Sequence, residues 1–235
     1  MPYQQTTRAQ LRGLVRNRLG NAAGTFWRDD ELDVAVIQPA LRLFNLLTGY
    51  WKTRVLFNTI ANQVWYQLPA SITSNLRVSW RDYPLSPSSF YDLDFGRSVW
   101  ESETTTSGGD VPTQPKVYGI GALNLIAIWP ADAAGSNSLV VDGIAATPIL
   151  ATDASFVDIG QEELSGLLDC AQMLAVFKEG GKEFSDSVEV FKKFLKSAGV
   201  RNSILLASST YRKFLGLDTS REKKPYKLAE RTGAR

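Results

Sequence analysis

The sequence contains no histidine and only one cysteine among its 235 residues. Histidine alone has an unperturbed pKa near neutrality and is the commonest metal ligand, so its absence excludes most hydrolase triads and zinc centres. Cys170 cannot form an intramolecular disulfide, and its neighbours, LLDCAQML, favour a buried helical thiol. Neither a GxxxxGK[ST] phosphate loop nor a GxSxG nucleophile elbow occurs. We therefore predict that the protein is not an enzyme, with no catalytic residues, cofactor or metal.

Long apolar runs are also absent. No stretch approaches the roughly 18 apolar residues that a membrane-spanning helix requires. The N-terminal segment, MPYQQTTRAQLRGLVRNRL, is interrupted by arginines and lacks the continuous apolar core of a signal peptide. We therefore expect a protein that is made in a cytosol and has no membrane partner.

The formal net charge of +2 conceals an uneven distribution. Residues 211–235 carry eight basic and three acidic side chains, so the chain ends in a basic tail. The first 20 residues are also basic, and the four-residue spacing of Arg8, Arg12 and Arg16 places them in one row of a helix. This row is a candidate DNA-channel or interface surface, and a solvated helix face is the alternative.

Helical periodicity occurs towards both ends of the chain. Residues 6–19 and 29–50 have apolar side chains at three- and four-residue spacing, and Pro39 predicts a kink or two abutting helices in the second segment. Two further helices, residues 160–179 and 184–198, are separated by a glycine pair and are predicted to form an antiparallel hairpin.

Between these helices, from Thr53 onward, alternating patterns rich in β-branched and aromatic residues predict strands. The predicted fold class is α+β: a four-helix core built from N- and C-terminal helical hairpins, with an inserted β-rich domain and an extended C-terminal tail. The predicted domains are residues 1–52 (N-terminal helical part of the core), 53–158 (β-rich insert), 159–203 (C-terminal helical hairpin completing the core) and 204–235 (extended basic arm).

Two residue groups in the insert have open interpretations. Acidic residues could offer oxygen ligands to a divalent cation, but their spacing matches no EF-hand loop, so surface acids are favoured: Asp82, Asp92, Asp94 and Asp110. Four tryptophans could stack on single-stranded nucleic acid or a sugar, or fill a β core or subunit interface: Trp65, Trp80, Trp100 and Trp129. A carboxylate-based glycan hydrolase acting through this insert is a third alternative.

Several sequence blocks, taken in order, resemble the head-to-tail connector proteins, or portal adaptors, of tailed bacteriophages. These blocks are FWRDDELDVAVIQPALRLFNLLTGYW, VWYQLP, LRVSWRDYPLSPSSFYDLD, PKVYGIGALNLIAIWPAD, VVDGIAATP and LLDCAQMLAVFKEGGKEFSDSVEVFKKFL. They cover nearly the whole chain, and their order and spacing carry the resemblance. Pro39 departs from the uninterrupted second helix that is expected in this family.

The resemblance implies a virion structural protein of the neck between head and tail, assembled in the host cytoplasm. Such proteins form a ring, here expected to contain twelve copies, beneath the portal protein. The ring continues the channel for packaged DNA, which it contacts non-specifically, and provides the platform for a downstream tail or nozzle protein. A C-terminal extension clasps the portal, and the corresponding arm residues here are Tyr211, Arg212, Lys213, Phe214, Leu215, Leu217, Arg221, Lys223, Lys224, Tyr226, Lys227, Leu228 and Arg231.

The composition of this arm supports the same interpretation independently. A basic segment with isolated apolar anchors cannot fold alone but can become ordered on a partner. The alternative function is a nucleic-acid-binding module that uses the basic C-terminal tail and the first helix.

Overall fold

The computed structural model describes residues 4–20, 26–122, 124–202 and 208–217. The chain divides into two compact units. The helical unit combines Met1–Thr48 with Leu150–Arg235, and the β unit is the continuous segment Gly49–Ile149. None of the helices in the described ranges is long and apolar enough to cross a membrane.

The helical unit begins with α1 (Arg8–Arg18), which starts at a complete capping box. The Thr7 side chain accepts a hydrogen bond from the Gln10 backbone N–H, and the Gln10 side chain accepts one from the Thr7 N–H. Both donors would otherwise be unpaired at the helix start. Leu11 and Val15, four residues apart, are buried, so α1 packs along one face.

The second helical segment continues through α2 (Asp29–Glu31), the π-helical turn η1 (Leu32–Ile37) and α3 (Gln38–Thr48). Pro39 lies in the first turn of α3 and has no backbone N–H to donate. Directly before it the Gln38 N–H donates to the Asp33 carbonyl, which is the five-residue spacing of a π-helix. The chain therefore stays helical across Pro39 by changing its hydrogen-bond pattern locally.

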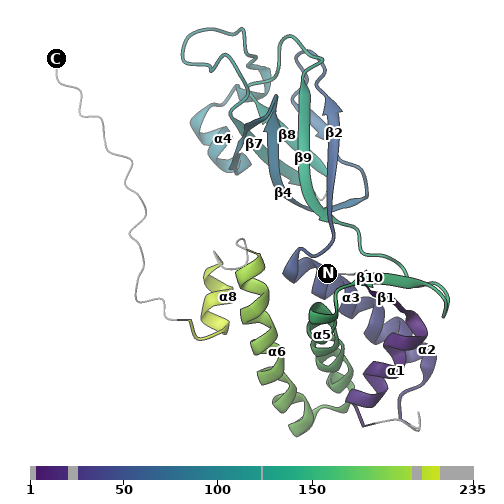
Figure 1. The fold of residues 1–235 in the computed structure, drawn as a ribbon. Coiled ribbons are helices and arrows are strands. Elements are labelled where there is room, and N and C mark those ends of the chain that lie inside the picture. The colour runs from purple at the N-terminus through teal and green to yellow at the C-terminus, as the bar shows by residue number, and fades with distance from the viewer. Residues whose placement is uncertain (1–3, 21–25, 123, 203–207, 218–235) are drawn as a thin grey trace. The chain divides into compact units, whose positions relative to one another are not determined.

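Two long helices, α5 (Gln161–Glu179) and α6 (Gly181–Arg201), pack against each other as a hairpin (Figure 1). The connecting residue, Gly180, has a φ of 69°, which an L side chain rarely adopts. Phe44 of α3 is 1% exposed, and its ring lies 6.0 Å from that of Phe194 on α6. The hairpin and the second helical segment therefore share one core.

The helical unit also contains a two-stranded antiparallel sheet, which corrects the predicted fold class. Strand β1 (Gln4–Thr7) pairs with β10 (Phe156–Ile159), and Gln4 lies opposite Ile159. The described residues form ten strands in three sheets, so the fold is mixed α/β and richer in strands than the predicted four-helix core. The prediction was wrong because four-residue strands are too short to show an alternating pattern.

The β unit contains two four-stranded sheets, with strand orders β2-β9-β4-β5 and β3-β8-β7-β6. Their elements are β2 (Lys52–Asn58), β3 (Trp65–Gln67), β4 (Ile72–Trp80), β5 (Tyr83–Pro84), β6 (Ser86–Ser88), α4 (Phe90–Gly96), η2 (Trp100–Ser102), β7 (Val117–Ala122), β8 (Leu125–Trp129) and β9 (Ser138–Ala145). Ile126 and Ile128 of one sheet and Leu139 and Val141 of the other belong to one buried cluster. The two sheets therefore pack face to face.

A buried carboxylate connects the loops of the β unit. Asp132 is 2% exposed and accepts hydrogen bonds from the Thr59 hydroxyl at 2.6 Å, the Asn137 amide at 2.7 Å and the Trp80 indole N–H at 3.3 Å. Burial raises the pKa of Asp132, but these bonds outweigh that effect and hold the pKa below its ordinary value. The negative charge of Asp132 is therefore stabilised by these neutral hydrogen-bond donors.

Candidate interaction site on α6 and α8

The last described element is the short helix α8 (Ser209–Phe214), which has signals at both ends. The Ser208 side chain caps its start by accepting a hydrogen bond from the Tyr211 backbone N–H. At its end Gly216 has a φ of 63°, its N–H donates to Lys213, and the Leu217 N–H donates to Arg212. This pair of bonds is a Schellman motif, so the helix stops before Leu217.

Helix α8 lies beside α6 (Figure 1), and an aromatic side chain connects the two helices. The Tyr211 hydroxyl donates a hydrogen bond to the Leu195 carbonyl, and burial raises the pKa of this phenol. A Cβ placed on Gly199 would lie 2.5 Å from the Tyr211 hydroxyl oxygen, so a larger residue there would displace the Tyr211 side chain. Leu215 is only 7% exposed. The described part of the C-terminal segment is therefore packed on the body of the protein.

The outer side of these two helices is basic with exposed apolar groups. We define the α6–α8 surface as Lys192, Lys196, Val200, Lys213 and Phe214. The first three follow one another at four-residue spacing along α6, and the Lys192 ammonium lies 5.7 Å from the Phe214 ring centroid. Phe214 is 51% exposed and Val200 is 82% exposed. The surface can therefore offer both positive charge and apolar area to a partner.

The predicted arm residues fall into two groups. Six lie in α8 or directly after it, and Lys213 and Phe214 among them are exposed: Tyr211, Arg212, Lys213, Phe214, Leu215 and Leu217. The other seven lie outside the described residues: Arg221, Lys223, Lys224, Tyr226, Lys227, Leu228 and Arg231. Their portal-binding role stays a prediction.

The arginine row of α1 is largely occupied by ion pairs. Arg8 lies 2.6 Å from Asp153, and Arg16 lies 2.5 Å from Asp29. Arg12 lies 2.5 Å from Asp33 and 2.6 Å from Asp153, and hydrogen bonds to these two carboxylates raise its pKa. The arginine row therefore connects α1 to η1 and to the loop before β10. The four-residue spacing of the arginines in the sequence could not indicate these partners.

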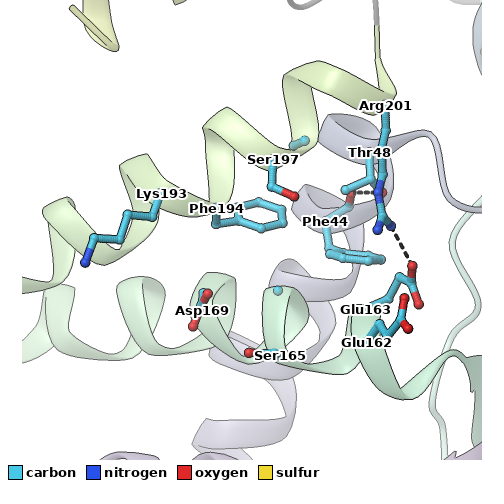
Figure 2. A pocket seen from close by; sticks show the side chains of 12 residues that line it. Phe44, Thr48, Glu162, Glu163, Ser165, Asp169, Lys193, Phe194, Ser197 and Arg201 are labelled. Carbon is cyan, nitrogen blue, oxygen red and sulfur yellow. Dashed lines mark hydrogen bonds and ion pairs between the residues drawn. The ribbon is translucent and has the colours of Figure 1, made fainter.

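A pocket of about 270 Å³ opens between α3, α5 and α6 (Figure 2). Figure 2 shows the rings of Phe44 and Phe194 at its centre and the Arg201 side chain extending towards Glu163, whose carboxylate lies 2.6 Å away. Asp169, on the same wall, is ion-paired with Arg18. Two of the acidic groups of the pocket are therefore used to join helices.

The remaining candidates for chemistry have structural contacts. Cys170 is fully buried, and burial raises the pKa of its thiol, which lowers its reactivity. The Trp100 indole donates to Asp94 and the Trp129 indole donates to Glu103, each at 2.7 Å. No group of three or more acidic or cysteine side chains suited to a metal ion occurs in the described part of the chain.

A comparison with known protein families gives the decisive observation. The family model of the SU10 adaptor protein matches residues 6–187, which include the whole β unit and most of the helical unit. The chain belongs to the SU10 adaptor protein family. The resemblance to phage head-to-tail adaptors is therefore confirmed, and the protein is a structural adaptor of a phage. None of the curated proteins matches this chain. The family match ends within α6, so α8 lies beyond it.

Proposed function

We propose that this adaptor forms a ring beneath the portal in the virion neck, continues the DNA channel and carries the downstream tail or nozzle protein. The family match carries this proposal, because it extends through both units of the fold rather than through one shared module. Twelve copies would match the portal expected from the resemblance. A closed ring requires two different and complementary faces on each copy.

We assign portal binding to the chain that follows Leu217 and count α8 as part of the body. The Tyr211 hydroxyl is hydrogen-bonded to α6, Leu215 is buried, and the Schellman motif at Gly216 ends α8 before Leu217. The sequence from residue 218 onward is basic with a few apolar anchors, which suits a segment that becomes ordered on a partner. In this proposal the arm binds the portal while α8 keeps its contact with α6.

Two truncations of the adaptor test this boundary. A chain ending at Leu217 should keep the circular dichroism and thermal transition of the full chain but lose binding to purified portal. A chain ending at Ser208 should lose binding too, and it should also be less stable because Leu195 and Gly199 lose the Tyr211 contact. Undiminished portal binding by the chain ending at Leu217 would show that the arm assignment is wrong.

The intact neck provides the test of the whole proposal. Electron cryo-microscopy of particles, or of portal mixed with adaptor, should show an adaptor ring under the portal with a continuous central channel. A dispersed adaptor that never engages the portal would contradict the proposal.

The nucleic-acid-binding alternative makes a separate prediction. It requires DNA affinity that falls steeply with salt, because phosphate contacts release counterions. Arg8, Arg12 and Arg16, on which the alternative partly relied, are ion-paired with carboxylates. We therefore expect the full chain, which keeps the basic tail, to show no tight salt-sensitive DNA binding in a fluorescence anisotropy titration, and tight low-salt binding would favour the alternative.

A further inference from the structure

An exposed aromatic stripe runs along α4 and the turn after it. We define the α4 stripe as Tyr91, Phe95 and Val99, which are 75%, 84% and 60% exposed. The rings of Tyr91 and Phe95 are stacked, with centroids 6.0 Å apart and planes 11° apart. The opposite side of the helix is packed, since Leu93 is only 8% exposed and Phe90 lies against Trp100.

Such exposure indicates a surface that is covered in an assembly. Large apolar side chains that gather on a soluble protein at successive helical turns commonly mark interaction sites, whereas isolated ones need no explanation. Sequence reasoning missed this stripe because an aromatic side chain in a strand-rich segment is more often part of the core. The four-residue spacing of Tyr91 and Phe95 was the available signal.

The rim of the α4 stripe is acidic. Asp92, Asp94 and Glu101 are exposed beside it. Arg97 lies between Phe95 and Val99 in the sequence and is already engaged, because its guanidinium lies 3.0 Å from the Glu103 carboxylate and 5.1 Å from the Trp129 ring centroid. The stripe therefore combines an apolar centre with net negative charge.

The α6–α8 surface has the complementary character. It places Phe214 and Val200 among three lysines, and Glu189 is the acid beside them, 2.7 Å from Lys192. Its hydrogen bond with Lys192 holds the pKa of Glu189 below its ordinary value. Positive charge therefore exceeds negative charge on this surface.

We propose that the α4 stripe of one copy docks on the α6–α8 surface of the next copy. The proposal rests on the proposed ring and names a contact between its subunits. Like charges oppose stripe-to-stripe pairing and pairing of two α6–α8 surfaces, whereas the unlike surfaces attract each other. A contact between two different surfaces is the heterologous kind from which a ring is built. The occupant is thus a second copy of this chain.

Charge reversal tests the contact, with the full chain and purified portal. D92K/E101K reverses the stripe and K196E/K213E reverses the α6–α8 surface. Each variant should form about tenfold fewer rings on the portal, counted by negative-stain electron microscopy, because like charges then face each other across the contact. Mixing the two variants should restore rings, because each contact between unlike variants then joins surfaces of opposite charge and the two variants can alternate around a ring of twelve. The chain that carries all four changes should restore them.

Two controls separate a lost contact from a damaged fold. K182E changes a lysine at the other end of α6 and should leave ring formation unchanged. The K196E/K213E variant should keep the thermal transition of the parent chain, and D92K/E101K should lower it only slightly, because the hydrogen bond that Asp92 loses to the Ser89 hydroxyl is exposed. In a C170S background, F95C combined with F214C should form disulfide-linked multimers only when portal is present, and either cysteine alone should not.

The outcomes distinguish this contact from the adaptor function itself. If the parent chain forms rings and both reversal variants also do, the contact is wrong although the adaptor role stands. If the D92K/E101K variant forms normal rings but fails to bind the tail protein, the stripe serves the tail and the proposal is overturned. If the parent chain forms no ring on the portal, the proposed ring and this contact fail together.

Discussion

The two units of the adaptor differ in how the chain builds them. The β unit is one continuous segment, and its first and last strands, β2 and β9, pair over the full length of β2. The helical unit joins two distant segments, Met1–Thr48 and Leu150–Arg235. If the β unit unfolds, the helical unit has to close a loop of about 100 residues, which costs roughly 4 kcal/mol. The stability of the helical unit therefore depends on the folding of the β unit more than the stability of the β unit depends on the helical unit.

The units also differ in how they hold their polar groups. The helical unit joins several of its elements through ion pairs near the surface, such as Arg201 with Glu163 and Lys178 with Glu31. The β unit encloses one carboxylate, Asp132, among neutral donors. A buried group with several partners is costly to disturb, whereas an exposed ion pair contributes little. Substitutions in the two units should therefore have unequal effects.

The largest effect is expected from Phe44→Ala. Phe44 is 1% exposed and stacked on Phe194, so its removal leaves a cavity and should lower the free energy of unfolding of the helical unit by about 3–5 kcal/mol. The same change at Phe95, which is 84% exposed, should cost about 0.5 kcal/mol or less. Urea denaturation followed by circular dichroism measures both. An equal shift of the β-unit transition by Phe44→Ala would show that the units unfold as one.

A slightly smaller effect is expected from Asp132→Ala in the β unit. It leaves the Thr59 hydroxyl, the Asn137 amide and the Trp80 indole without their acceptor and should cost roughly 3 kcal/mol. Asp142→Ala is the matched control, because Asp142 pairs with an exposed arginine and its loss should change stability little. Tryptophan fluorescence during urea unfolding reports on this unit. Equal effects of the two changes would refute the role of Asp132.

The same carboxylate makes the β unit sensitive to acid. The pKa of Asp132 is lower in the folded state, so the unfolded state binds its proton at higher pH. The stabilisation is complete above about pH 4, near the unfolded value, and is lost as pH falls through the folded pKa. Urea midpoints of the parent chain should therefore fall on acidification. Asp132→Asn should flatten this dependence, and Asp142→Asn should retain most of it.

The smallest effect concerns the arginine row. Arg12→Met leaves Asp33, whose side chain is only 9% exposed, without its closest cation and should lower stability of the helical unit by about 2 kcal/mol. Arg28→Met is the control, because Arg28 and Asp30 form an exposed pair and should contribute nothing measurable. Thermal unfolding at low and high salt measures both changes. If Arg12→Met leaves the stability of the helical unit unchanged, the arginine row of α1 is not needed for folding and has another role.

Local signals in the sequence were sufficient for several elements. The first helix was predicted over residues 6–19 and is observed as Arg8–Arg18, because its cap and apolar spacing lie within the helix itself. The glycine pair between the last two long helices likewise marks the observed turn at Gly180. Elements of this kind depend on neighbours within a few residues, which a single sequence displays.

Contacts between distant residues could not be predicted in this way. The β1–β10 pair joins residues about 150 positions apart, and each strand has only four residues. The sequence named Tyr211 as an anchor of an arm that binds another protein, whereas the structure places its hydroxyl against the Leu195 carbonyl of the same chain. An apolar or basic side chain shows that a partner is needed, but not whether the partner belongs to the same chain.

The sequence by itself determined the absence of histidine chemistry, the basic C-terminal tail, most helices and the order of blocks that resembles the phage adaptors. These properties depend on composition and on short-range periodicity. Only the tertiary structure decided that the α1 arginines are matched by aspartates and that Tyr91 and Phe95 remain exposed. Which side chains are buried or paired depends on which elements pack against each other. The free energy of burial arises only when two surfaces leave water in contact with each other, and these two surfaces can be far apart in the sequence.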